Sequence, residues 1–92
     1  MGILKKSTFE VVAESGIHAR PATGLVHKAS SFSSEIFIEY NERKANLKSI
    51  LGVMSLGIAQ GESFSIYVEG EDEEEAFAGL VSYMQSEGLI SS

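Results

Sequence analysis

Residues 35–47 read Glu-Ile-Phe-Ile-Glu-Tyr-Asn-Glu-Arg-Lys-Ala-Asn-Leu, and this stretch decides the fold. Its first six residues alternate between polar and apolar, which is typical of a strand with one buried face. Asn41-Glu42 then predicts a tight turn, although Asn-Gly would be the stronger turn pair. Ala45 and Leu47 mark a short second strand that returns beside the first. A hairpin of this kind favours antiparallel pairing.

Two further segments, residues 8–13 and 64–68, show the same alternation and predict the other strands of a sheet. One face of this sheet would be apolar. The opposite face would meet water, as is common for antiparallel sheets. The polar residues expected there are Glu10, Glu39, Ser65, Tyr67 and Glu69.

Three segments have apolar residues at helical spacing. The first helix is expected from Pro21, at the first helical position, to about residue 32. The second is expected to start at Ile50, with Ser49 as its N-cap, and to end at Gly57. The third follows Asp72 and Glu75, which resemble a capping box, and ends near residue 88.

The predicted order is β-α-β-β-α-β-α within one domain of residues 1–92. Four strands with all helices able to cover one face make an open-faced α/β (α+β) sandwich, a four-stranded antiparallel sheet with three helices on one side. The chain has no cysteine, which removes disulfides and thiolate metal sites. Its two separated histidines and scattered acids make no plausible metal-ligand set, so neither a metal nor a cofactor is expected.

The chain is acidic, with a formal net charge of −6. This charge argues against direct nucleic-acid binding, which needs clustered Lys and Arg. No apolar run is long enough to span a membrane, and the first residues do not resemble a signal peptide. These features predict a soluble cytoplasmic protein. The acidic run 71–75 has two interpretations, of which a solvated helix start is favoured over a binding tail.

The candidate for chemistry is His18, which lies shortly before the helix expected at Pro21. Free N–H groups at a helix start bind anions, and the helix dipole adds positive potential. A phosphoryl group on the His18 imidazole would be held by those donors and by Arg20. The same potential would keep the imidazole neutral and nucleophilic near pH 7. The alternative is that His18 is an ordinary loop residue. His27 is expected on the exposed helix surface.

The segment 49–57 carries more apolar residues than one short helix buries. Ile50, Leu51 and Met54 would therefore form either a somewhat apolar core helix or a docking patch for a partner. The polar face of the preceding helix, with Thr23, Gly24, His27 and Lys28, would supply the other half of such a patch. Ser49 also has two interpretations, a plain N-cap or a regulatory phosphorylation site that the helix start would tolerate.

Two motifs, Gly16-Ile-His-Ala-Arg-Pro-Ala22 and Lys48-Ser-Ile-Leu-Gly-Val-Met-Ser-Leu-Gly57, resemble the signatures of HPr, the histidine-containing phosphocarrier family of the bacterial sugar phosphotransferase system. The resemblance covers about residue 8 to Leu89. It implies that His18 accepts phosphate on Nδ1 from phospho-enzyme I and passes it to IIA proteins of sugar permeases. Such a protein is a stoichiometric carrier rather than an enzyme, and Arg20 would steady the phosphoryl group.

The same resemblance implies that HPr kinase/phosphorylase modifies Ser49 and that the product acts as a corepressor with the catabolite control protein. Ile50, Leu51 and Met54 match the family's apolar partner surface. The chain departs from common patterns at Leu51, at Gly24 and at the 41–43 turn. The stretch 70–76 resembles Crh, an HPr-like regulator with glutamine in place of the active histidine.

Three functions therefore remain open. The first is a phosphocarrier acting through His18. The second is a Crh-like regulatory module acting through phosphorylated Ser49. The third is a small binding domain in which His18 is incidental. A monomer and a dimer that exchanges its first strand are both compatible with the sequence.

Overall fold

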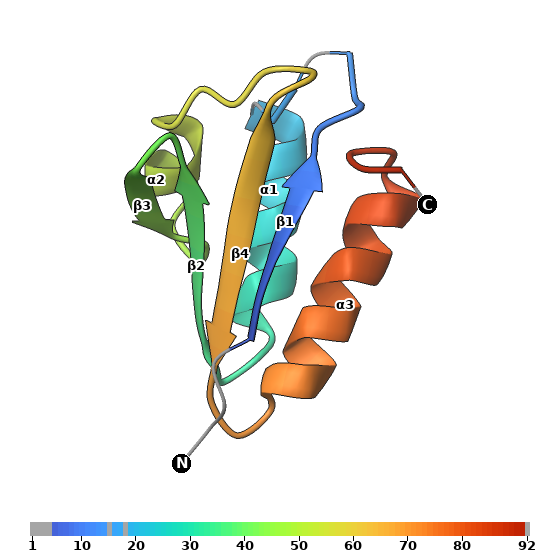
Figure 1. Ribbon diagram of the computed structural model, residues 1–92. Helices are drawn as coiled ribbons and strands as arrows, with labels where there is room; N and C mark the ends of the chain where they lie inside the picture. The colour runs from blue at the N-terminus through green and yellow to red at the C-terminus, as the bar shows by residue number, and fades with distance from the viewer. Residues whose placement is uncertain (1–4, 15, 18, 92) are drawn as a thin grey trace.

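The computed structural model describes residues 5–14, 16–17 and 19–91, apart from the side chains of Lys5, Ala19 and Arg20. The predicted order of elements is confirmed (Figure 1). The elements are β1 (Lys5–Glu10), α1 (Ala19–Ser30), β2 (Glu35–Tyr40), β3 (Arg43–Asn46), α2 (Ile50–Met54), β4 (Ser63–Glu69) and α3 (Glu73–Ser86).

The strands form one antiparallel sheet in the order β1-β4-β2-β3. All three helices lie on the same face of this sheet, as Figure 1 shows. The two central strands, β4 and β2, send their alternate apolar side chains into the layer between sheet and helices. The buried residues of these strands are Ile36, Ile38, Phe64, Ile66 and Val68.

The opposite face is polar, as predicted, but it also carries two aromatic rings. Tyr67 and Phe37 are cross-strand neighbours on β4 and β2. The Lys44 Nζ lies 4.5 Å from the centroid of the Tyr67 ring and 5.2 Å from that of Phe37. The Tyr67 hydroxyl donates to Glu39 Oε1 at 2.5 Å. The rings are thus covered by side chains of the sheet itself, through cation–π contacts.

Three predicted boundaries were wrong. The first strand, expected at 8–13, is Lys5–Glu10, because pairing with β4 ends where Glu10 meets Ser63. Helix α1 starts at Ala19, so Pro21 is its third residue and still lies within the first turn. The N–H groups of this turn make no hydrogen bond within the helix, so proline costs none there. Helix α2 ends at Met54 rather than Gly57, since the following turn tightens to i→i+3 hydrogen bonds.

The predicted capping box at α3 was also wrong. Asp72 makes no side-chain cap hydrogen bond. Its carboxylate instead accepts from the N–H groups of Ser33 and Ser34, both at 2.9 Å, and from the Ser34 hydroxyl. Glu73, which is buried, accepts from the N–H of Gly70 at 3.0 Å. Two acids of the 71–75 run therefore have internal partners, and Asp72 ties the start of α3 to the loop between α1 and β2.

The hairpin between β2 and β3 turns through two residues with positive φ, Asn41 at 54° and Glu42 at 68°. Asn tolerates this conformation, whereas a glutamate Cβ is disfavoured in it. We expect Glu42→Gly to raise the free energy of unfolding by about 0.5–1 kcal/mol, measured by urea denaturation. Glu42→Ala keeps the Cβ and should give no gain. Equal stability of both variants and the parent would show that the turn is not strained.

The three hydrogen bonds to Asp72 predict a specific response to acid. The bond from the Ser34 hydroxyl has the largest effect, followed by that from the Ser33 N–H. Together these hydrogen bonds stabilise the carboxylate and lower the pKa of Asp72 from 3.8 to about 2. Because the pKa is lower in the folded state, this contribution to stability is complete above about pH 4 and is lost as the pH falls toward 2.

We therefore expect Asp72→Asn to unfold at lower urea concentration than the parent at pH 7. The gap between the two midpoints should narrow as the pH falls from about 4 to 2. A gap that stays constant across this range would contradict the assignment.

Candidate functional site

The segment that leads to residue 18 is fastened to the rest of the molecule by its backbone. The Ile17 N–H donates to the carbonyl oxygen of Ile58 at 2.9 Å, and the Val12 N–H donates to that of Leu89 at 2.8 Å. The Gln60 Nε2 also donates to the Val12 carbonyl oxygen at 3.2 Å. The Ile17 side chain is buried. Residues 12 and 17, which precede α1, are therefore held by backbone hydrogen bonds to distant parts of the chain.

Gly16 allows the chain to pass close to the segment 58–59. It has φ +70°, and a Cβ at this position would lie 2.9 Å from the Cα of Ala59, too close for any other residue. The segment 58–62 is itself held by Glu62, whose carboxylate accepts from the Ala59 N–H at 3.1 Å. Two hydrogen bonds lower the pKa of Glu62: the one from the Tyr40 hydroxyl has the larger effect and the one from the Ala59 N–H the smaller. The hydrogen bond from the Ala59 N–H to Glu62 thus links the two ends of the turn 59–62.

His18 itself lies outside the described residues, and so does the side chain of Arg20. What the structure describes is the start of α1 at Ala19, the next residue in the chain. The N–H groups of the first turn have no acceptor within the helix, and no acidic residue lies in that turn. The positive end of the α1 dipole lies at this first turn, where it favours an anion.

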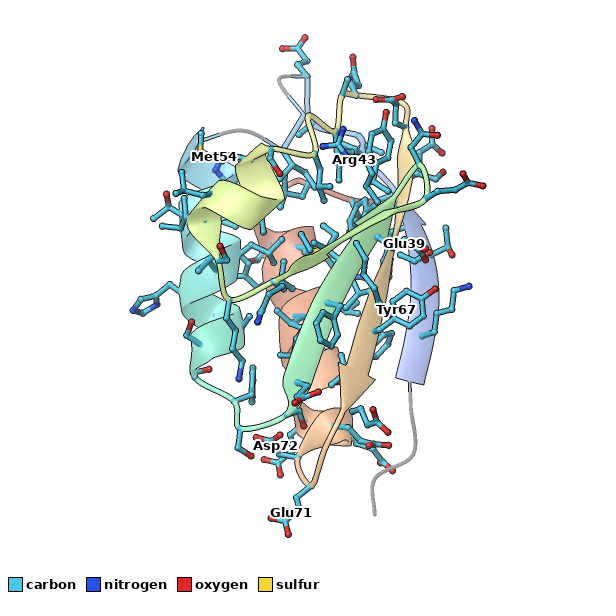
Figure 2. All side chains as sticks on the ribbon, turned by 90° about the vertical axis from the view of Figure 1, so that its left-hand side faces the viewer. Glu39, Arg43, Met54, Tyr67, Glu71 and Asp72 are labelled. Carbon is cyan, nitrogen blue, oxygen red and sulfur yellow. The ribbon has the colours of Figure 1, made fainter. Side chains whose placement is uncertain are left out.

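The apolar residues of α2 behave as the docking-patch interpretation requires. Leu51 is 81% exposed, Met54 41% and Ile50 39%, whereas Val53 is fully buried. Helix α2 contacts α1 and lies at the end of the molecule where α1 begins (Figure 1). In Figure 2, Met54 and Arg43 mark this end, and Asp72 and Glu71 mark the opposite one. We name Ile50, Leu51 and Met54 the α2 patch.

Ser49 is the N-cap of α2, as predicted. Its backbone is extended and its Oγ accepts from the Gly52 N–H at 3.2 Å. The residue is exposed, so its hydroxyl is accessible to a modifying enzyme. The preceding residue, Lys48, donates from Nζ to the carbonyl oxygen of Phe32 at 2.8 Å, a contact that no sequence pattern indicated.

The remaining predicted site residues lie on α1. Thr23 is exposed, and Gly24 is partly buried against Tyr83 of α3. Their role in partner binding stays a prediction. His27 is exposed in the last turn of α1, as expected for a surface histidine. No helix among the described residues has the length and apolar character needed to cross a membrane.

Comparisons with known proteins agree with this arrangement. The profile of the family described as "PTS HPr component phosphorylation site" matches residues 5–86. The histidine-containing phosphocarrier protein of Mycoplasma is 38% identical, with a TM-score of 0.93 over 96% of this chain and 100% of that chain.

Two other solved structures are informative. HPr from Thermoanaerobacter tengcongensis is 48% identical, with a TM-score of 0.85 over 89% of this chain and 92% of that one. Crh from Bacillus subtilis, a catabolite repression protein found as a swapped dimer, is 42% identical, with a TM-score of 0.71 over 87% and 92%. The similarity thus covers most of each protein.

Proposed function

The chain belongs to the HPr family of phosphocarriers of the phosphotransferase system, and from this we propose that it carries a phosphoryl group on His18. The group would come from phospho-enzyme I and pass to IIA proteins of sugar permeases. The observation that supports this proposal is that the Ile17 N–H is bound to the Ile58 carbonyl oxygen and that α1 starts at Ala19, the residue after His18 in the sequence.

The proposed chemistry is a transfer between two imidazoles. The Nδ1 lone pair of neutral His18 forms a new P–N bond while the P–N bond of the donor breaks and its electron pair returns to the donor nitrogen. The donor imidazole takes up a proton as the phosphorylated His18 ring loses its Nε2 proton. The helix start supplies N–H donors and positive potential to the phosphoryl oxygens, and Arg20 supplies a full charge. These groups stabilise the charge of the phosphoryl oxygens. The phosphoryl group stays on His18 until a partner accepts it, so the chain acts as a carrier that its partners regenerate.

The α2 patch is proposed to bind those partners. Three neighbouring exposed apolar side chains beside the start of α1 offer the anchors that a protein interface needs. Thr23 and Gly24 would border the interface on α1. We propose that residues 1–92 form one domain and that the protein is cytoplasmic. Its partners there would be enzyme I, IIA proteins, HPr kinase/phosphorylase and the catabolite control protein. Neither membrane insertion nor direct nucleic-acid contact is part of the proposal.

Ser49 is proposed as a regulatory site, phosphorylated with ATP by HPr kinase/phosphorylase. Its exposure and its place directly before the α2 patch support this. A second candidate function, a Crh-like corepressor of catabolite repression acting mainly through phosphorylated Ser49, is favoured by the 42% identity to Crh. The presence of His18 favours the carrier, since Crh-type chains resemble HPr without the active histidine.

The first test is labelling with phosphoenolpyruvate and enzyme I. We expect an acid-labile phosphate on the parent chain and on His27→Ala, but none on His18→Ala. Arg20→Ala should be labelled about 100-fold more slowly, because it lacks the charge that stabilises the transferring group, with little change in its urea midpoint. Labelling that survives in His18→Ala would reject the carrier site, and an unlabelled parent would leave the Crh-like function.

The second test is incubation with ATP and HPr kinase. We expect one acid-stable phosphate on the parent and none on Ser49→Ala, with Ser31→Ala, another exposed serine, as the matched control. The phosphorylated parent should retain its circular dichroism spectrum, because a helix start accommodates negative charge. Phosphate incorporated into Ser49→Ala would remove the regulatory assignment.

A further inference from the structure

Helix α1 carries a glycine in its middle, and α3 places a tyrosine against it. A Cβ built at Gly24 would coincide with the hydroxyl oxygen of Tyr83 and lie 2.9 Å from Cζ of the same ring. The Tyr83 ring packs against the core, and burial, followed by the charge of Glu87, raises the pKa of its hydroxyl. The neutral Tyr83 phenol therefore occupies the space that the Cβ of any residue other than glycine would need at position 24.

This contact fixes the half of α1 that leads to the proposed phosphoryl site. Gly24 follows Ala19 by five residues, so Tyr83 meets the helix about 7.5 Å from its first residue. A helix of 12 residues transmits displacement along its axis, because its backbone hydrogen bonds keep it rigid over this length. A shift of α1 at Gly24 would therefore move Ala19 and Arg20 by a comparable amount.

The same two helices have a second contact of this kind, between the middle of α3 and the residue that lies beyond the end of α1. A Cβ at Gly79 of α3 would lie 2.8 Å from Cζ of Phe32, just beyond the end of α1. Asp72 binds Ser33 and Ser34 at that end as well. The α1–α3 packing thus has two aromatic–glycine contacts, one facing the first half of α1 and one beyond its last residue.

We propose that Tyr83 is a positioning residue for phosphoryl transfer: seated on Gly24, it sets the place of the first turn of α1 relative to the fastened segment 16–17. This inference rests on the proposed carrier function. Rate depends steeply on such placement, since a displacement of about 1 Å can cost about 100-fold in a transfer reaction. Tyr83 touches no reacting atom in this scheme and acts through the helix.

The experiment compares Gly24→Ala with Gly79→Ala, in which the new Cβ would lie 2.8 Å from Cζ of Phe32 in the same interface, a less severe overlap than the one at Gly24. Each variant is assayed for its urea midpoint and for the kcat and KM of labelling by enzyme I. We expect both variants to lose stability, Gly24→Ala more than Gly79→Ala. The expected loss of kcat is about 10- to 100-fold in Gly24→Ala, with a change below about threefold in Gly79→Ala. Equal losses of kcat would overturn the proposal.

Tyr83→Leu provides the second arm, because it removes the ring instead of pushing it. It should lower kcat about tenfold, and adding Gly24→Ala to it should change kcat by less than about twofold. Such non-additivity identifies Tyr83 as the group through which Gly24 acts. If Gly24→Ala instead lowers kcat by the same factor in both backgrounds, Gly24 does not act through Tyr83 and the proposal is wrong.

The parent chain separates this inference from the function on which it rests. A labelled parent with equal losses in the two glycine variants overturns only the role of Tyr83. An unlabelled parent overturns the carrier function, and the role of Tyr83 with it.

Discussion

The structure depends on one constraint, which is that the apolar face of a single four-stranded sheet must be covered. The central strands β4 and β2 bury the side chains that need this cover, and the helices lie on that face alone. Strands β1 and β4 are antiparallel neighbours, and each is followed by a helix that runs back along this face of the sheet. Helices α1 and α3 therefore run in opposite directions (Figure 1). The start of α1, the whole of α2 and the end of α3 therefore lie toward the same end of the molecule. The proposed phosphoryl site and the α2 patch owe their proximity to this topology.

Covering the sheet with three helices in so small a chain brings segments that are distant in sequence into contact. Backbone hydrogen bonds between such segments hold the residues that precede α1. The Val12 N–H is bound to the carbonyl oxygen of Leu89, after the end of α3, and the Ile17 N–H to that of Ile58. The segment that precedes α1 is thus held by two parts of the chain that are distant in sequence. Since each bond uses a backbone group, its geometry is set by the fold and depends little on side-chain identity. This suits the role proposed for the segment, which leads to His18 in the sequence.

The sequence predicted the order of elements, the buried face of each strand, the N-cap at Ser49 and the exposure of the α2 patch, because each follows from local periodicity or capping chemistry. It failed where the partner is distant. Asp72 was assigned to a local capping box, but its carboxylate binds Ser33 and Ser34, about 40 residues earlier, which local patterns do not encode. The first strand was placed too late because its alternation continues beyond the residues that pair with β4. Gly24 was correctly identified as unusual in a helix, but its reason, the ring of Tyr83, lies on another element.

The position of Ser49 bears on how a regulatory phosphate would act. Its Oγ already accepts from the Gly52 N–H, and a phosphate oxygen offers the same hydrogen bond with more charge, so the start of α2 would be preserved. What changes is the potential beside Ile50 and the rest of the α2 patch, where close to two negative charges would be added to a chain of net charge −6. A partner that itself carries a phosphoryl group would be repelled before contact, whereas a partner with a basic surface would be attracted. On this view one modification both weakens the carrier function and favours a regulatory complex, and it does so by electrostatics without a change of fold.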